Sequence, residues 1–352
     1  MKGERTDMYL IEKEIKDQFS AMDKTVALVK SQEEQIVTYF GSAKKIIVLG
    51  CGSSYMIGKS AASLILNMTG ISAYAIAAGD LLLNTNIYKT LIKDASLLVL
   101  SRSGSTTEIL LAIQSAMLQG AKECLSVCAA ENAEISALCT YNLEIPWSFD
   151  KSVCQTRTVT NLYAAVLTAV ALHVKDREVL GALEKASGYY ASFALEYDDT
   201  LKDIAKAQWS HGVVIADGMV SGLAEEGALA FKEICQCNSN YYHVLDVRHG
   251  PMVMISKDTL VLQLITSDKK QLQYDLLTDL KKKGAVCVIF NSAEAPRSKA
   301  DFSITLPQTD SPLVSVLFMM YAVQVITYER ALQSGVNPDN PDGLDAWIEL
   351  KY

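Results

Sequence analysis

The chain has 352 residues, of which 50% are hydrophobic and 20% charged, a composition typical of a folded enzyme with more than one domain or lobe and unlike that of a disordered protein. Its formal net charge of -8 and isoelectric point near 5.2 provide no basic surface field, so we expect neither a nucleic acid nor a membrane as a partner. Eight cysteines lie scattered in apolar runs, with no CxxC pair and no zinc-ligand pattern, which predicts reduced thiols, a cytoplasmic location and no bound metal.

A charged, amphipathic segment opens the chain in place of the apolar stretch that an export signal requires, and it predicts a leading helix over residues 8–40. Strands and helices then alternate through the first half. The pattern predicts a strand at 45–49, a helix at 56–68, a strand at 72–76, a further helix, a strand at 95–100, a helix at 106–119, a strand at 123–128 and a closing segment at 142–146.

The second half repeats this order, with a strand at 212–216, a helix at 223–235, a strand at 259–265, a helix at 272–283, a strand at 285–290 and a closing segment at 303–307. Gly120 and Gly284 precede corresponding strands, and Pro146 and Pro307 follow corresponding closing strands, at an offset of roughly 160 residues. This predicts a duplicated α/β chain of two tandem doubly wound, flavodoxin-like lobes, each with a parallel sheet.

We expect a helical lead at 1–40, a first lobe at 41–165, a helical connector at 166–200, a second lobe at 201–335 and a tail at 336–352. Two long apolar stretches, 162–174 and 313–327, predict buried helices, because both are shorter than the ~20 residues of a membrane span.

Two loops of the first lobe carry small hydroxyl and glycine residues at the point where a strand gives way to a helix. Free backbone N–H groups and the helix dipole favour an anion at such a junction. Together the loops offer hydroxyl groups and one cation, at Ser53, Ser54, Ser101, Arg102, Ser103, Ser105, Thr106 and Thr107. A single loop of this kind is more often a helix cap, but two in successive units predict a sugar-phosphate pocket.

The same loops argue against a nucleotide cofactor. Tyr55 stands where the dinucleotide fingerprint has its third glycine, and no acidic residue ends the strand at 72–76 to bind a ribose. The second lobe has no comparable hydroxyl cluster after its strands. We therefore expect one phosphate site, in the first lobe, and no cofactor.

Four segments resemble, in order, the signature segments of tandem sugar isomerase (SIS) domain proteins, and the resemblance covers nearly the whole chain. The segments are Gly-Cys-Gly-Ser-Ser at 50–54, Leu-Ser-Arg-Ser-Gly-Ser-Thr at 100–106, Glu-Gly-Ala-Leu-Ala-Phe-Lys-Glu-Ile at 226–234 and Arg-His-Gly-Pro at 248–251. This family includes the isomerase half of glucosamine-6-phosphate synthase and the deglycases of fructosamine 6-phosphates.

The resemblance implies a sugar-phosphate substrate, with phosphate contacts from Gly52, Ser53, Ser54, Ser101, Arg102, Ser103 and Thr106. It makes Glu233 the general base and His249 the ring-opening histidine, delivered by a neighbouring subunit, so that the active site lies at a homodimer interface. Gln155, in a loop that closes over the sugar, and Glu226, on the same helical face as Glu233, are further candidates.

The chemistry agrees with these roles. Moving a proton between C1 and C2 of an amino sugar needs a carboxylate with a raised pKa and a proton donor, which a Glu–His pair supplies. Without the resemblance, Glu233 would be assigned to a solvated helix face, and His249 would equally fit a loop residue that caps the backbone.

Ala230 and Ala346 stand where the synthase has lysines. A lysine is needed to open or trap a ketose, but not to hydrolyse an imine that already exists. We therefore predict a deglycase of a 6-phosphorylated ketosamine, of the fructoselysine or glucoselysine 6-phosphate type, acting by C1–C2 proton transfer and imine hydrolysis. An amino-sugar-phosphate deaminase or ketose–aldose isomerase (glucosamine or galactosamine 6-phosphate type) and a non-catalytic phosphosugar sensor stay open as alternatives.

The C-terminal tail has apolar residues, Leu344, Trp347, Ile348 and Leu350, and ends in Tyr352. Either it folds over the active site and selects the amine substituent, or it forms a dimer or surface latch.

Overall fold

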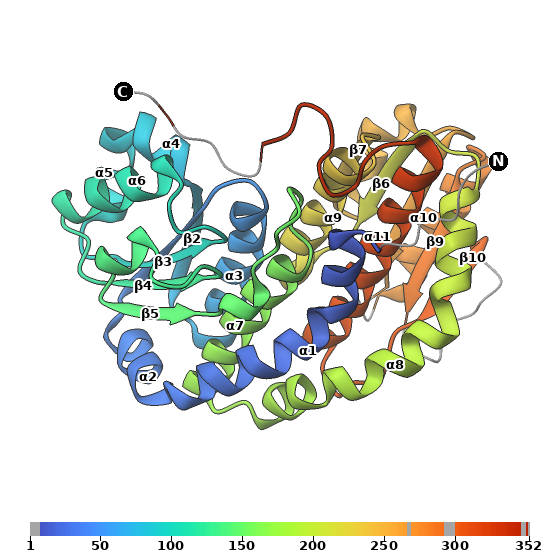
Figure 1. Cartoon of the computed structure of the whole chain (residues 1–352). Coiled ribbons are helices and arrows are strands. Elements are labelled where there is room, and N and C mark those ends of the chain that lie inside the picture. The colour runs from blue at the N-terminus through green and yellow to red at the C-terminus, as the bar shows by residue number, and fades with distance from the viewer. Residues whose placement is uncertain (1–7, 266–268, 292–299, 346–349, 351–352) are drawn as a thin grey trace.

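Two parallel sheets lie side by side in the computed structural model, which describes residues 8–265, 269–291, 300–345 and 350 (Figure 1). The first sheet has the order β2-β1-β3-β4-β5, with β1 at Lys45–Gly50, β2 at Ser72–Ala77, β3 at Ser96–Ser101, β4 at Cys124–Cys128 and β5 at Tyr141–Glu144. The second has the order β10-β9-β8-β6-β7, with β6 at His211–Ile215, β7 at Asn238–Tyr242, β8 at Thr259–Leu264, β9 at Val286–Asn291 and β10 at Phe302–Thr305. Counted along each half, both sheets have the order second, first, third, fourth, fifth, the flavodoxin-like order, which confirms the predicted duplication.

The helices cover both faces of the sheets and fill the space between them. They are α1 at Leu10–Ser31, α2 at Glu33–Ser42, α3 at Ser53–Thr69, α4 at Ala78–Leu83, α5 at Thr85–Ile92, α6 at Thr107–Leu118, α7 at Arg157–Val174, α8 at Arg177–Lys206, α9 at Ser221–Ile234, α10 at Lys270–Lys282 and α11 at Pro312–Ser334. In Figure 1, α3, α7, α9 and α11 lie between the sheets, while α1 and α8 run below them. Because helices cover both faces, the central strands β3 and β8 are buried at every residue and appear in the sequence as unbroken apolar runs.

The two long apolar stretches form core helices, as predicted. α7 is buried over its whole middle, and α11 packs against α8 and α9. By length and composition alone α11 could cross a membrane, but 83% of its apolar window is buried inside the protein. Its hydropathy is therefore explained by its place in the core.

Two sequence predictions are wrong in detail. The leading helix is not continuous, because the chain bends at Gln32 and α2 turns to bury Tyr39 and Phe40 against α7. The second half also contains β7, a strand that the sequence pattern did not predict. β7 is an edge strand of polar and half-exposed residues, so it lacks the apolar run that marks the central strands.

The two lobes meet where α3 crosses α9, and glycine at position 222 allows the contact. A Cβ atom there would lie 2.2 Å from the Met56 carbonyl oxygen and 2.7 Å from the Ser60 nitrogen, both backbone atoms that cannot swing away. Across the same contact the Leu223 N–H donates to the Ser60 hydroxyl at 3.1 Å, and Lys59 pairs with Glu225 at 2.7 Å. This close approach of the α3 and α9 backbones fixes the position of α9 relative to the loop that precedes α3.

We expect Gly222→Ala to lower the free energy of unfolding by about 3 kcal/mol, because the cost of forcing the helices apart exceeds the helix-propensity gain of about 1 kcal/mol. Gly227→Ala is the matched control on the same helix, since its Cβ would meet only side-chain atoms at ordinary distances of 3.6 Å and beyond. Urea unfolding of both variants checks this. A Gly222→Ala midpoint equal to that of Gly227→Ala would show that the crossing tolerates a methyl group.

Candidate functional site

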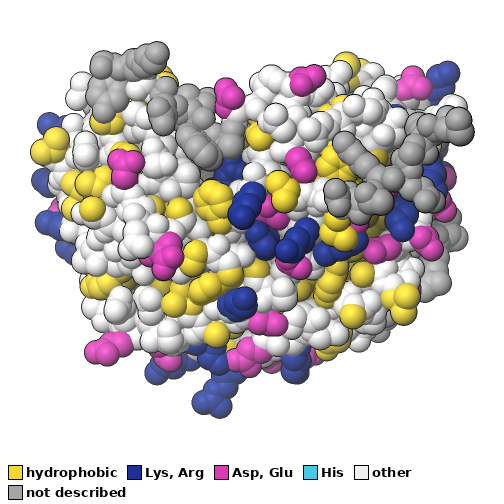
Figure 2. All heavy atoms as spheres, in the orientation of Figure 1, with side chains coloured by type: hydrophobic (Ala, Val, Ile, Leu, Met, Phe, Trp, Pro, Cys, Tyr) yellow, Lys and Arg dark blue, Asp and Glu magenta, His cyan; other side chains and the backbone are white. Residues whose placement is uncertain are grey.

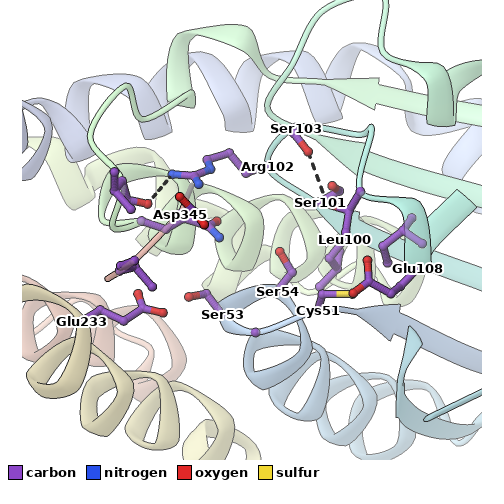
Figure 3. A pocket seen from close by; sticks show the side chains of 16 residues that line it. Cys51, Ser53, Ser54, Leu100, Ser101, Arg102, Ser103, Glu108, Glu233 and Asp345 are labelled. Carbon is purple, nitrogen blue, oxygen red and sulfur yellow. Dashed lines mark hydrogen bonds between the residues drawn. The ribbon is translucent and has the colours of Figure 1, made fainter. Parts of the chain in front are cut away.

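The two hydroxyl-rich loops lie together at the carboxyl edge of the first sheet, where they line one cavity of about 230 Å³ (Figure 3). The first joins β1 to α3 and contributes Gly52, Ser53 and Ser54, with both serines in the first turn of the helix. The second joins β3 to α6 and contributes Ser101, Arg102, Ser103 and Thr106. Parallel strands end at the same edge, so loops about fifty residues apart in the sequence converge.

The second loop is held in a tight turn that aims its donors at the cavity. The Ser101 hydroxyl accepts the Gly104 N–H at 2.9 Å, and Ser103 lies 3.4 Å from Thr106, oxygen to oxygen. Gly104 has φ +64°, and a Cβ there would lie 2.5 Å from the Ala133 side chain, so only glycine fits the turn. The hydroxyls clustered at the starts of two helices, together with the helix dipoles, suit a phosphate dianion.

Arg102 extends from the end of β3 across the cavity, toward the side where Glu233 lies (Figure 3). Its guanidinium donates to the carbonyl oxygens of Ser152 and Val153 at 3.0 and 2.9 Å, and the residue is only 5% exposed. Burial lowers the pKa of Arg102, while the neighbouring carboxylates, including Glu233, oppose that shift. The cavity thus contains a fixed cation between the phosphate loops and a carboxylate.

The loop that receives Arg102 is itself fixed by two buried carboxylates. Glu14 of α1 accepts the Lys151 N–H at 2.6 Å and the Ser152 hydroxyl. Asp150 accepts the N–H groups of Thr156 and Thr158 at 2.7 and 2.9 Å. Burial raises the pKa of Asp150 to about 6, with a contribution from the Glu14 charge. Gln155 of the same loop lines the cavity.

Glu233 lies in the last turn of α9 and faces the cavity opposite Ser53 (Figure 3). Burial raises its pKa to about 7, although the Arg102 and Lys232 cations act to lower it. A carboxyl group with this pKa is populated in both protonation states near neutrality, as an acid–base catalyst requires.

Glu226 lies two turns earlier on α9 and is not among the residues that line the cavity. It is 2% exposed, and the nearby Ser53 hydroxyl acts to lower its pKa. Burial and the nearby Glu233 charge raise the pKa of Glu226 well above its ordinary value. Glu226 is therefore a buried carboxyl group near Ser53 that does not line the cavity.

The C-terminal tail leads from the end of α11 in the second lobe to the cavity (Figure 1). The Asp339 carboxylate accepts N–H groups of the first turn of α1, and its carbonyl accepts the Val153 N–H at 2.9 Å. Beyond the cavity, the Leu350 N–H donates to the Thr107 hydroxyl at 3.3 Å. Leu344 and Asp345 line the cavity. Ala346, Trp347, Ile348 and Tyr352 lie outside the described residues.

His249 is exposed on a loop of the second lobe, directly after a short 3-10 turn at Asp246–Arg248, and it is not among the residues that line the cavity of its own chain. A single chain therefore brings together the predicted phosphate contacts, Gln155 and Glu233, but not His249. The surface between the lobes is hollowed and carries acidic and basic side chains in mixture (Figure 2). Among the described residues, no group of three or more His, Cys, Asp and Glu side chains could hold a metal ion.

Sequence reasoning did not single out several residues that the structure places on the cavity: Cys51, Leu100, Glu108, Ile109, Val153 and Asp345. Cys51 and Leu100 lie inside the two motifs, and Glu108 and Ile109 follow the second at the start of α6, so their proximity could have been anticipated. Asp345 had no such signal, because it reaches the cavity only through the path of the tail.

Replacing Arg102 with glutamine is expected to raise the pKa of Glu233 above about 7, because the cation that favours the carboxylate is removed while burial stays. A ¹³C NMR titration of glutamate-labelled protein, assigned with a Glu233→Gln sample, measures this. Arg157→Gln is the control, since Arg157 binds the Phe149 carbonyl outside the cavity. An unchanged or lower pKa in Arg102→Gln would show that the two groups do not interact.

The chain is similar to several known proteins. The chain is 27% identical over 345 residues to glutamine–fructose-6-phosphate aminotransferase [isomerizing] of Sulfurisphaera tokodaii, covering 96% of this chain and 56% of the relative. The chain thus spans about half the length of the curated relatives it matches.

Two solved structures share the fold. The C-terminal domain of glucosamine-fructose-6-phosphate aminotransferase from Francisella tularensis superimposes with a TM-score of 0.85 at 18% identity, covering 95% of this chain and 99% of the other. Glucosamine-6-phosphate deaminase from Thermotoga maritima gives a TM-score of 0.77 at 21% identity, covering 97% and 100%. The family model for the SIS domain matches residues 39–172 and 207–328, one copy for each sheet. The chain therefore belongs to the SIS domain family.

Proposed function

We propose that this chain is a phosphosugar enzyme of the isomerase kind, and specifically a deglycase that releases the amine from a 6-phosphorylated ketosamine. The observation that carries the proposal is the position of Glu233, whose pKa is raised to about 7, on the same cavity as two phosphate-type loops. The names of the relatives, which act on fructose 6-phosphate or glucosamine 6-phosphate, support a hexose 6-phosphate as the substrate class.

In the proposed reaction the phosphate is bound by the loop hydroxyls and helix N–H groups, and this fixes C1 and C2 of the open-chain sugar near Glu233. Glu233 removes a proton from C1 while the oxygen at C2 takes up a proton from solvent, giving an enolamine, and Glu233 then returns its proton to C2. The product is an imine at C1, which water cleaves to an aldose 6-phosphate and the free amine. Arg102, held by two carbonyls, provides positive charge beside the oxygen at C2 where negative charge develops.

The lining of the cavity supports a substrate that already contains the C–N bond. No lysine is among the residues that line the described cavity, so none of them could form a Schiff base with a ketose. Asp345 adds a carboxylate at the rim, which suits a substrate that brings its own cationic amine. Lys351 lies outside the described residues.

We also propose that the working form is a homodimer in which His249 reaches the partner's cavity and opens the sugar ring. Exposed apolar side chains lie within five residues of this histidine in the sequence: Leu245 is 46%, Val253 80% and Met254 64% exposed. Such a cluster favours a protein contact over solvent. A cytoplasmic location and the lack of nucleic acid and membrane partners stay predictions.

A coupled assay for glucose 6-phosphate, with fructoselysine 6-phosphate and glucoselysine 6-phosphate as substrates, tests the proposal. We expect release of glucose 6-phosphate together with an equal amount of lysine. Ammonia formed from glucosamine 6-phosphate or galactosamine 6-phosphate, with the ketosamines untouched, would instead identify a deaminase. Ketose–aldose interconversion without amine release would identify an isomerase. Tight binding of glucose 6-phosphate without any turnover would identify a sensor.

A further inference from the structure

The second lobe has a cavity of its own, of about 450 Å³, at the carboxyl edge of its sheet. Its walls come from the ends of β8 and β9, from Lys270 at the start of α10, and from the segment at 306–312 that leads into α11. The cavity is larger than the candidate active site of about 230 Å³, and its volume lies in the range of small-molecule sites, roughly 300–1,000 Å³.

The duplication of the chain places this cavity where the first lobe has its candidate active site. β8 is the third strand of its half, as β3 is, and each cavity takes a basic residue that follows this strand, Arg102 in one lobe and Lys270 in the other. Each also takes residues from the segment between the fifth strand and the next long helix, such as Gln155 and Thr309. Because doubly wound sheets bind ligands at this edge, the second cavity lies in a position suited to binding.

Hydroxyl groups held by the fold form the wall that precedes α11. The Thr309 hydroxyl donates to the Ser311 carbonyl at 2.8 Å and lies 2.9 Å from the Ser315 hydroxyl. The Ser315 hydroxyl donates to the Pro307 carbonyl at 2.9 Å. Thr309 and Ser311 are only 1% and 5% exposed. This wall therefore offers hydrogen-bonding groups whose positions are set before a ligand binds, which lowers the entropy cost of binding.

Lys270 gives the cavity a positive charge that no neighbouring acid neutralises. Its half-buried side chain forms no ion pair or hydrogen bond in the part of the chain that the structure describes. Lys270 is also the first residue of α10, where the helix dipole disfavours a cation and favours an anion. Asp310, the one carboxylate among the described residues that line the cavity, is already paired with Lys185 at 3.7 Å. An anionic ligand would supply the partner that Lys270 lacks.

We propose that this cavity binds a small sugar phosphate at a second site, where the ligand does not react. The phosphate pairs with Lys270, the sugar hydroxyls bond to the wall of Thr309 and Ser315, and the C–H faces of the sugar pack on Leu264 and Leu306. Among the described residues that line the cavity, none is a His, Cys or Glu that could act as acid, base or nucleophile. The sequence predicted one phosphate site, because only the first lobe has hydroxyl-rich loops. The second site does not depend on the reaction proposed for the first.

Equilibrium dialysis of the full chain against radiolabelled glucose 6-phosphate tests the site. We expect two molecules to bind per wild-type chain at saturation. Lys270→Gln should weaken the second site about tenfold, the effect of losing one charge-assisted hydrogen bond, and Lys270→Glu should abolish it. Lys282→Gln is the matched control on α10, because Lys282 pairs with Asp279 and does not line the cavity. A count that is the same in the wild type and in Lys270→Glu would overturn the proposal.

Hydrogen exchange shows which of the two sites is occupied. Glucose 6-phosphate should slow exchange of the backbone amides between 306 and 315 severalfold in the wild type and in Lys282→Gln, but not in Lys270→Glu. The amides at 52–54 and 101–106 report the candidate active site separately, so failure of one site is distinguished from failure of the other. Inorganic phosphate and glucose, each used alone, should bind the second site severalfold more weakly. Unchanged exchange between 306 and 315, or equal affinity for inorganic phosphate, would refute a sugar-phosphate site.

Discussion

Glu233→Gln is expected to lose turnover by about a hundredfold to ten-thousandfold, the range that a positioned acid–base group contributes. Glutamine has nearly the same shape and can still occupy the end of α9, but it cannot accept the C1 proton. The phosphate loops are on the other lobe, so binding of the substrate phosphate should persist. Steady-state kinetics should show the loss in kcat with a small change in KM.

The same substitution is expected to stabilise the fold above neutral pH. In the folded chain the pKa of Glu233 is raised from 4.5 to about 7, so the native state keeps a proton that the unfolded state has released between these pH values. The stability of the wild type therefore falls as pH rises through this window, by about 3 kcal/mol at most. Glutamine carries no charge to bury. The gain in unfolding free energy of Glu233→Gln over the wild type is therefore absent near pH 4 and complete at pH 8.

Urea unfolding of both proteins at pH 4.5 and pH 8 measures this difference. Glu225→Gln on the same helix is the control, because it removes a half-exposed pair with Lys59 and no buried charge. We expect that control to keep its activity and to lose stability by about 1 kcal/mol or less. If the Glu233→Gln enzyme were active, Glu233 could not be the acid–base catalyst. If the difference in unfolding free energy between Glu233→Gln and the wild type were the same at both pH values, the Glu233 carboxyl group would not be desolvated.

Most of the fold could be predicted because its central strands are buried on both faces. Such strands have unbroken apolar sequences, so β1, β3, β8 and β9 and the loops after them can be recognised from the sequence. β7 could not be recognised in this way, because an edge strand is half-exposed and its sequence, Asn-Ser-Asn-Tyr-Tyr, resembles a loop. The break at Gln32 depends on where α2 packs, which local sequence does not encode.

The residues of the candidate site likewise differ in how well the sequence predicts their positions. The phosphate-type loops are local motifs, and the sequence alone was enough to locate both. Glu226 and Glu233 share a helical face at a spacing of seven residues, but only tertiary packing places Glu233 on the cavity and leaves Glu226 buried away from it. Asp345 depends on the path of a tail that crosses from one lobe to the other. Long-range placement of this kind follows from tertiary contacts and leaves no periodic signal in the sequence.

Mixing two inactive variants is expected to restore part of the enzyme activity. Glu233→Gln and His249→Ala should each be nearly inactive alone. If each cavity takes Glu233 from one chain and His249 from the other, a mixed dimer has one cavity with both residues intact and one with neither. Random reassociation makes half of the dimers mixed, so about a quarter of the wild-type activity should return.

The alternative arrangement gives the opposite result, and this makes the experiment decisive. If His249 served the cavity of its own chain, every cavity in a mixed dimer would lack one of the two residues, and no activity would return. His249 is exposed and does not line the cavity of its own chain, and the exposed Val253 and Met254 follow it by four and five residues, which favours the shared arrangement. The variants are mixed after mild dissociation, and activity is followed together with the dimer fraction by analytical ultracentrifugation. Activity that stays absent while mixed dimers form would contradict the shared site, because the two intact residues would then be present in one particle without meeting in one cavity.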